Sequence, residues 1–120
     1  MILFALIVLI VLFTINAVYF RKGFYEKGRE VLWFGRLMHF GGGFFVGMLG
    51  SGLGFSPVVF TLAIGITWEI GEYLFGLYFW KFRGTKKYMT ETRDTIEDLV
   101  LDVVGAAAWA LAYFSVLGYL

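Results

Sequence analysis

The stretch MHFGGGFFVGMLGSGLGF, residues 38–55, decides how this chain folds, because it combines the apolarity of a membrane helix with many glycines. Seven of its residues are glycine, and its second residue, His39, is the only histidine in the chain. Glycine costs the interior of a soluble helix about 1 kcal/mol relative to alanine, whereas small residues let helix backbones approach closely in a bilayer. The stretch therefore predicts a membrane helix that packs tightly along one face.

The composition of the 120-residue chain predicts an integral membrane protein with a single domain. Hydrophobic residues make up 60% of the chain and charged residues only 16%, whereas about a quarter of the residues in ordinary soluble domains are charged. The chain has no cysteine, which excludes a disulfide framework and a thiolate metal site. No basic run or phosphate-binding glycine loop occurs, so we expect the lipid bilayer and no nucleic acid as partner.

Four segments are long and apolar enough to be membrane spans, since the hydrocarbon core of a bilayer requires roughly 20 helical residues. The predicted spans are residues 1–20, 31–55, 57–80 and 94–117. Short connections between them favour antiparallel neighbours. We therefore predict an all-α fold, in which residues 1–120 form a single transmembrane domain of four helices.

The lysine and arginine residues predict how these helices are oriented. Nine of the ten lie in two connections, residues 21–30 and 81–93, whereas the connection at 54–57 and the C-terminal end carry none. The positive-inside rule places both basic loops in the cytoplasm. We therefore expect a multi-pass protein of the plasma membrane with both termini outside, and a first helix that is retained rather than cleaved as a signal peptide.

Ionisable residues on three predicted helices approach one depth in the membrane. The polar intramembrane residues are Arg36, His39, Glu69, Glu72, Asp98 and Asp102. Counted inward from the cytoplasmic helix ends, His39, Glu72 and Asp102 lie about 12–13 Å deep, and Glu69 is expected nearer the midplane. Each helix contributes a pair spaced three or four residues apart, which share one face. Because a charge facing lipid is costly, these faces should turn toward one another.

Glycines continue the same helix faces and predict where the helices pack. The expected packing positions are Gly43, Gly47, Gly50, Gly65, Gly76 and Gly105. On the second helix this stripe runs from His39 to Gly54, and Gly43 and Gly47 form a G-x-x-x-G pair. Such pairs bring helix backbones together in membranes. We expect the second helix to pack against the two acidic helices, and homodimerisation through Gly43 and Gly47 is the alternative.

Charge balance favours a site for a cation or a proton. The four intramembrane carboxylates outnumber the positive charges that Arg36 and His39 can supply, so the excess must be protonated, hydrated or bound to a cation. Carboxylate oxygens with one imidazole suit Mg²⁺, Mn²⁺ or Zn²⁺. The candidate metal ligands are His39, Glu69, Glu72, Asp98 and Asp102. The alternative is a structural contact between helices, in which Arg36 pairs with Asp98 or Glu72 and His39 donates a hydrogen bond to a carboxylate.

Two acids at the start of the fourth helix are expected to be structural. Asp94 and Glu97 have the spacing of an N-cap residue and its N3 partner. Such a pair satisfies N–H groups that a helix start leaves without partners. We therefore leave both residues out of the candidate site.

The segments WEIGEYLFG (68–76) and DTIEDLVLDVVGA (94–106) resemble the signature of the YjdF-like and VanZ-like small bacterial membrane proteins. The pattern is W-E-x-x-E on one helix, then D-T-x-x-D-L and a downstream Asp or Asn before Gly-Ala on the next. The matching residues are Trp68, Glu69, Glu72, Asp94, Thr95, Asp98, Leu99, Asp102, Gly105 and Ala106, together with His39 on the preceding helix. Many relatives have more than four spans, and several carry Asn at the position of Asp102. The resemblance implies a multi-pass fold and no particular substrate.

Three functions fit such a site. In the first, a divalent ion binds or acts on a lipid-type amphiphile, while Arg36 and the basic loops attract its anionic head. In the second, the carboxylates carry protons or cations in transport, which four helices would favour only as an oligomer. In the third, the chain is a non-catalytic subunit whose glycine faces bind another membrane protein.

Overall fold

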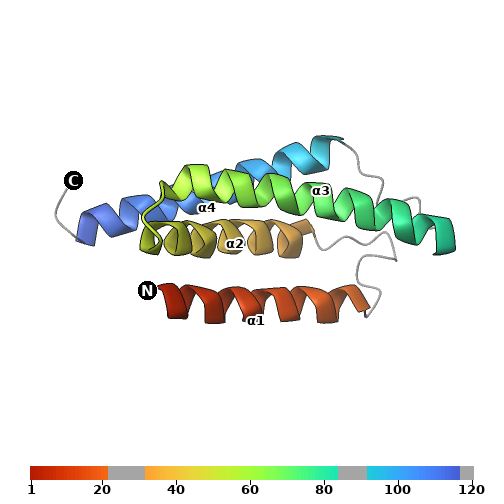
Figure 1. The fold of residues 1–120 in the computed structure, drawn as a ribbon, viewed down its shortest axis with the longest axis horizontal. Helices are drawn as coiled ribbons and strands as arrows, with labels where there is room; N and C mark the ends of the chain where they lie inside the picture. The colour runs from red at the N-terminus through yellow and green to blue at the C-terminus, as the bar shows by residue number, and fades with distance from the viewer. Residues whose placement is uncertain (22–31, 84–91, 117–120) are drawn as a thin grey trace.

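The computed structural model describes residues 1–21, 32–83 and 92–116, and these residues form four α-helices (Figure 1). The helices are α1 (Ile2–Arg21), α2 (Leu32–Gly52), α3 (Pro57–Arg83) and α4 (Thr92–Val116). The predicted all-α fold with four helices is confirmed. One difference concerns α3, which continues past its predicted end and overhangs the neighbouring ends of α2 and α4 (Figure 1).

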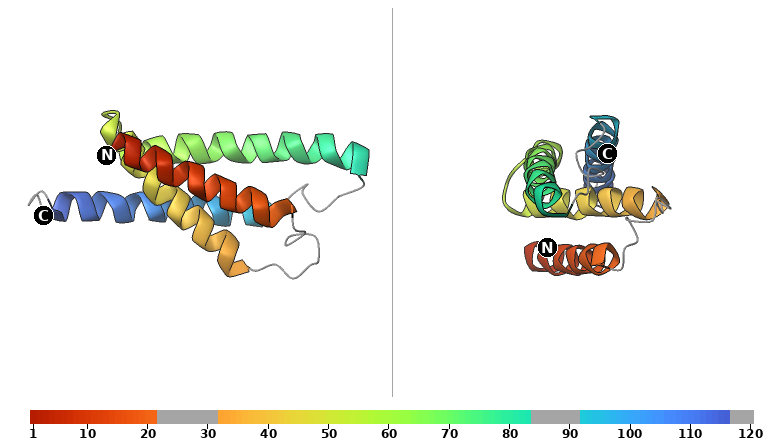
Figure 2. Two further views of the ribbon diagram at one scale, coloured as in Figure 1. Left: turned by 90° about the horizontal axis from the view of Figure 1, so that it is seen from below. Right: turned by 90° about the vertical axis from the view of Figure 1, so that its right-hand side faces the viewer.

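The second helix lies at the centre of the bundle. α3 and α4 pack on one side of α2, and α1 packs on the other (Figure 2). Among the described helices, the backbone of α1 approaches α2 alone, although the Phe13 ring reaches Trp68 of α3 at a centroid distance of 5.9 Å. The polar faces of α2, α3 and α4 are therefore left to pack against one another.

The closest helix contact joins α2 and α4, where two glycines remove side chains from the interface. A Cβ atom at Gly43 would overlap the backbone of Asp102, and a Cβ atom at Gly105 would overlap the backbone of Phe40. Both positions require glycine because any side chain would force the two backbones apart. The two acids of α4 are thereby held close to α2.

Other glycines lie at the remaining helix contacts. Gly47 of α2 lies against α4, Gly50 lies against the Phe60 ring of α3, and Gly65 of α3 faces α4. Gly76 is helical, but its surroundings lie outside the described residues. Small residues thus line the contacts between α2, α3 and α4 at each of the described positions.

The connection between α2 and α3 forms a helix cap, whereas the sequence predicted that the glycine packing stripe continues to Gly54. Gly54 has a φ of 86°, and nothing lies within contact distance of a Cβ atom placed on it. The Phe55 N–H donates to the Gly50 carbonyl at 2.8 Å, and the Gly54 N–H donates to the Ser51 carbonyl at 3.1 Å. These two bonds form a Schellman motif, in which the left-handed position favours glycine. The expectation that Gly54 continues the packing stripe is therefore wrong.

The outer surface of the bundle is apolar, whereas several polar side chains are buried. Large aliphatic and aromatic side chains are exposed along α1, α3 and α4. By contrast, Thr61 is only 2% exposed, and Glu69 and Asp102 are each 9% exposed. A protein in water normally buries the first kind of side chain and exposes the second. This inverted distribution is typical of a protein whose surroundings are lipid.

Among the described residues, one helical segment is both long enough and apolar enough to cross a membrane, and it is Ile96–Val116. Ile2–Asn16 and Pro57–Gly71 are shorter apolar segments. The apolar stretch of α2 is interrupted by Arg36 and His39. The crossing of the membrane by all four helices therefore stays a prediction.

Candidate functional site

His39 of α2 lies between two carboxylates of α4. Its Nδ1 atom is 3.1 Å from Asp102 Oδ1, and its Nε2 atom is 3.3 Å from Asp98 Oδ2. Because Asp98 and Asp102 are four residues apart on a helix, they lie on one face, one turn apart. The imidazole spans that turn and links α2 to α4 where Gly43 lets the backbones meet.

Both ring nitrogens of His39 face a carboxylate oxygen. A ring nitrogen contacts an ionised carboxylate favourably only when it carries a hydrogen, because such a carboxylate only accepts hydrogen bonds. The neutral imidazole carries a hydrogen on one nitrogen and a lone pair on the other, so it can donate to Asp102 or to Asp98 but not to both. A lone pair facing a carboxylate is repulsive unless a proton or a metal ion lies between them, so this geometry suits a cation.

Glu69 brings a third helix into the cluster. One ligand atom each from His39, Glu69 and Asp98 lie within 4.8 Å of one another. A metal ion bonded at about 2.0–2.2 Å to nitrogen and oxygen ligands separates those ligands by no more than about 4.4 Å. Small side-chain movements would therefore bring the three atoms into one coordination sphere.

A buried hydroxyl group on α3 was missed by the sequence analysis. The Thr61 hydroxyl donates to the Gly43 carbonyl at 3.5 Å, and the residue is almost completely buried. Thr61, Gly65 and Glu69 are spaced four residues apart, so extending the acidic face of the helix by one turn would have found it. Thr61 links α3 to α2 beside the cluster.

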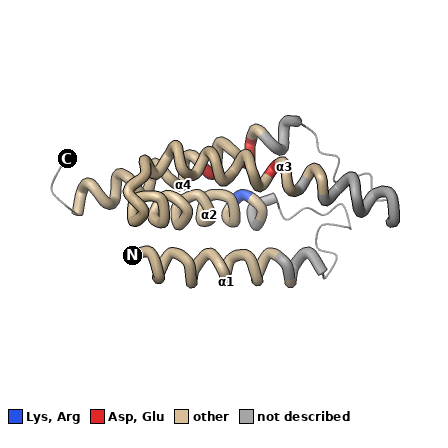
Figure 3. The backbone as a smooth tube through the Cα atoms, in the orientation of Figure 1, with Lys and Arg blue, Asp and Glu red and all other residues tan. Residues whose placement is uncertain are grey.

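The position of Glu69 differs from the depth expected for it. Glu69 was expected deeper than His39, yet its carboxylate lies beside the His39 ring and Asp98. The depth of Glu69 was counted inward from the end of its helix. This depth is wrong because α3 overhangs the other helices, so its end is not level with theirs (Figure 1). The side chain of Glu72 lies outside the described part of α3, and its place in the site stays a prediction. The described charged residues lie on neighbouring stretches of α2, α3 and α4 (Figure 3).

Arg36 pairs with an acid that the sequence analysis had set aside. Its Nε atom lies 2.6 Å from Glu97 Oε1, and the two side chains are 56% and 37% exposed. This partner is neither of the two acids expected for Arg36. α4 begins at Thr92, so Asp94 lies inside the first turn and is not the N-cap, and the Glu97 carboxylate reaches α2 instead of completing a capping pair.

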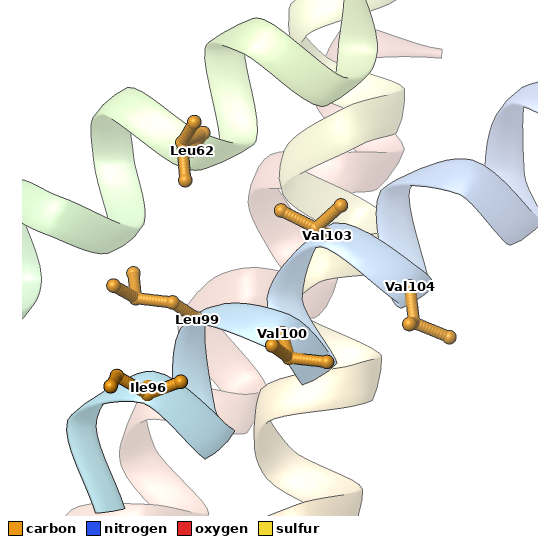
Figure 4. Close-up of a pocket in the computed structure, with 6 residues that line it drawn as sticks. All are labelled: Leu62, Ile96, Leu99, Val100, Val103 and Val104. Carbon is orange, nitrogen blue, oxygen red and sulfur yellow. The ribbon is translucent and has the colours of Figure 1, made fainter. Parts of the chain in front are cut away.

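An apolar groove of about 280 Å³ follows the contact between α3 and α4, with α2 behind it (Figure 4). Its walls are formed by Leu62 of α3 and by Ile96, Leu99, Val100, Val103 and Val104 of α4. Leu99 also faces the site, since a Cβ atom on Gly65 would lie 3.0 Å from Leu99 Cδ2 and 2.9 Å from Asp102 Oδ2. Leu99 therefore lines the groove and also lies, like the Asp102 carboxylate, against Gly65.

Four helices with an apolar exterior and an inward-facing cluster of histidine and carboxylates define a small α-helical membrane protein. The chain belongs to the family described as predicted membrane protein (DUF2238), whose model matches residues 49–118. The match includes Glu69, Asp98 and Asp102, and it begins after His39. No curated protein and no solved structure matches the chain. Membership of this family confirms the lipid bilayer as the expected surroundings.

Proposed function

We propose that this membrane protein binds a divalent metal ion through His39, Glu69 and Asp98, and that the ion holds the anionic head group of an amphiphile. Glu72, which lies one turn from Glu69 on α3, is proposed as a further ligand. In this proposal the site lies in the cytoplasmic half of the membrane. The ion acts as a template for the head group and polarises its oxygen atoms.

The contact of His39 with Asp102 carries the proposal. A metal-bound histidine usually donates its other ring N–H to a carboxylate, which fixes the tautomer and the orientation of the ring. The 3.1 Å contact between His39 Nδ1 and Asp102 Oδ1 has this geometry, and Nε2 lies 3.3 Å from Asp98 Oδ2. Asp102, which the sequence pattern groups with the ligands, is therefore proposed to orient His39 rather than to bind the ion.

The charge of the cluster also supports a bound cation. Three described carboxylates, those of Glu69, Asp98 and Asp102, surround one imidazole. Unbalanced charges within a membrane are expensive, and Mg²⁺ and Mn²⁺ prefer oxygen ligands such as carboxylates. A divalent ion would offset most of the negative charge.

The surroundings of the cluster support an amphiphile with an anionic head. Arg36 lies three residues before His39 on α2, and its side chain is more than half exposed. The two basic loops would add positive charge at the same membrane surface. Guanidinium groups form strong hydrogen bonds with phosphate and carboxylate groups, so the head group would meet Arg36 on its way to the ion.

We also propose the predicted topology in the plasma membrane. Residues 1–120 form one transmembrane domain with both termini outside, and the basic loops 21–30 and 81–93 lie in the cytoplasm. The distribution of lysine and arginine supports this orientation.

We also propose a relationship to the YjdF-like and VanZ-like proteins. The order and spacing of the W-E-x-x-E and D-T-x-x-D-L motifs support that relationship.

Metal analysis of the purified full-length protein tests the proposal. We expect one divalent ion per chain in the wild type and loss of that ion in Glu69→Gln. The matched control is Glu97→Gln, which removes an acid of α4 that contacts Arg36 instead of His39, and it should keep the ion. Circular dichroism should show that both variants retain their helices.

A wild-type protein without stoichiometric metal would show that the metal proposal is wrong. A pH-gradient flux assay in liposomes would then test transport by the same carboxylates. Loss of metal from Glu69→Gln and Glu97→Gln alike would also contradict the proposed ligand set.

A further inference from the structure

We infer that the apolar groove between α3 and α4 holds the hydrocarbon chain of the amphiphile whose head group binds at the cluster. This inference rests on the proposed function, because the head group supplies the reason for an amphiphile. The structural basis is the aliphatic chemistry of the groove walls (Figure 4) and the position of Leu99, which lines the groove and lies, like the Asp102 carboxylate, against Gly65.

The groove and the cluster follow one face of α3. Leu62 lines the groove, and Glu69 contributes to the cluster seven residues later. Seven residues are nearly two full turns, so the two side chains point within about 20° of each other around the helix. A molecule extended along this face of α3 would meet Leu62 with its apolar part and Glu69 with its polar end.

The direction of the groove matches that of a lipid in the cytoplasmic leaflet. The groove follows α4 from Ile96, two residues before Asp98, to Val104, which is about 12 Å of helix. In the proposed orientation the Ile96 end faces the cytoplasmic surface and Val104 lies deeper. The head group would therefore lie at the level of Asp98, and the chain would run toward the midplane.

The walls of the groove favour an alkyl chain over a helix of a second protein. Helices associate in membranes mainly through small residues and through polar residues that form hydrogen bonds. The residues that line this groove are all leucine, isoleucine or valine. The glycines at 43 and 105 are already occupied by the contact between α2 and α4. The groove thus lacks the residues that a docking helix would use.

The groove would direct the chain more than it would strengthen binding. Lipid tails are as apolar as leucine side chains, so a chain that moves from bulk lipid into the groove gains little from hydrophobicity. The affinity must therefore come from the head group at the ion. The described lining of the groove contains no carboxylate, so the hydrocarbon chain would contact aliphatic side chains alone.

Photolabelling of the full-length protein in phosphatidylcholine vesicles tests this inference. The probe is a single-chain alkyl phosphate with a diazirine near the far end of its chain, used with Mn²⁺. We expect saturable labelling of the groove residues that is removed by excess dodecyl phosphate and not by dodecanol. Val103→Trp should fill the groove and abolish this labelling without changing the metal content.

Leu111→Trp is the matched control, because Leu111 is an exposed aliphatic residue of α4 outside the groove. It should label like the wild type. Labelling spread over all exposed faces, or unchanged by Val103→Trp, would show ordinary surrounding lipid only and overturn the inference. Crosslinks between two chains through the groove would overturn it in favour of a second copy.

The metal measurement separates this inference from the proposed function. Groove labelling that is lost in Val103→Trp but needs neither Mn²⁺ nor Glu69 would support a chain-binding groove and contradict the metal-held head group. Stoichiometric metal in a protein whose groove takes no label would support the metal site and overturn the groove assignment.

Discussion

Asp102 of α4 contacts two residues of α2. The Asp102 side chain contacts His39, and the Asp102 backbone lies against Gly43. Its Oδ1 atom contacts the His39 Nδ1 atom at 3.1 Å, while its Oδ2 atom faces the position where Gly65 of α3 lacks a side chain. Three helices thus converge on one buried carboxylate. Helix packing and the polar site are therefore coupled, since a change in the glycine contacts would move the carboxylate relative to His39.

Replacement of Gly43 by alanine should destabilise the bundle. The new Cβ atom would overlap the Asp102 backbone, and overpacking of this kind costs about 1–3 kcal/mol. We expect a lower thermal unfolding midpoint in detergent. Gly42→Ala is the control on the next residue, where nothing lies near a Cβ atom, and it should leave the midpoint unchanged or raise it. Equal effects of both substitutions would contradict the close approach of α2 and α4.

Asp102→Asn should weaken metal binding without abolishing it. In the proposed function, Asp102 orients His39, and loss of such a supporting carboxylate typically costs about 10–100-fold in metal affinity. A metal titration followed by calorimetry measures the change. Glu69→Gln, which removes a proposed ligand, should have the larger effect, and the reverse order would contradict the assigned roles.

Arg36→Ala should affect binding of the amphiphile more than stability. Arg36 and Glu97 form an ion pair between side chains that are 56% and 37% exposed, and solvent-exposed pairs contribute about 0–1 kcal/mol. We expect little change in the unfolding midpoint but weaker competition by dodecyl phosphate in the photolabelling experiment. Arg36→Lys keeps the positive charge and should retain part of the competition. A large fall in the midpoint for Arg36→Ala would instead indicate a structural role.

Cysteine labelling should establish the topology. The chain contains no cysteine, so single substitutions can be placed without removing natural thiols. In intact cells, Ser56→Cys in the connection between α2 and α3 should react with a membrane-impermeant maleimide. Lys27→Cys and Lys86→Cys in the two basic loops should react only after the membrane is opened. Reaction of all three positions from outside would contradict the proposed four-span orientation.

The helical architecture was predictable because it depends on local properties of the chain. Runs of apolar residues separated by short connections, two of them charged, predicted four helices, and the helices agree with those segments apart from their ends. Pro57 marked the start of α3 because a missing N–H costs nothing at the first helical position. The overhang of α3 was not predictable, since the end of an apolar run does not show where the helix itself ends.

The members of the site were more predictable than their pairing. Spacing of three or four residues placed acids on one face of each helix, because this spacing is a local property of the α-helix. The same reasoning assigned Glu97 to a cap and overlooked Thr61, whereas the structure pairs Glu97 with Arg36 and buries Thr61 against Gly43. These contacts depend on how far each helix is rotated and shifted along its neighbour, which spacing within one helix does not determine.

By itself, the sequence determined that the chain forms apolar helices with polar and glycine-rich faces, because composition and periodicity act within single segments. Only the tertiary structure decided that Asp98 and Asp102 lie on either side of His39 and that Glu69 joins them. The physical reason is the close approach at Gly43 and Gly105. This approach sets the relative positions of α2 and α4, and with them the distances between the polar groups.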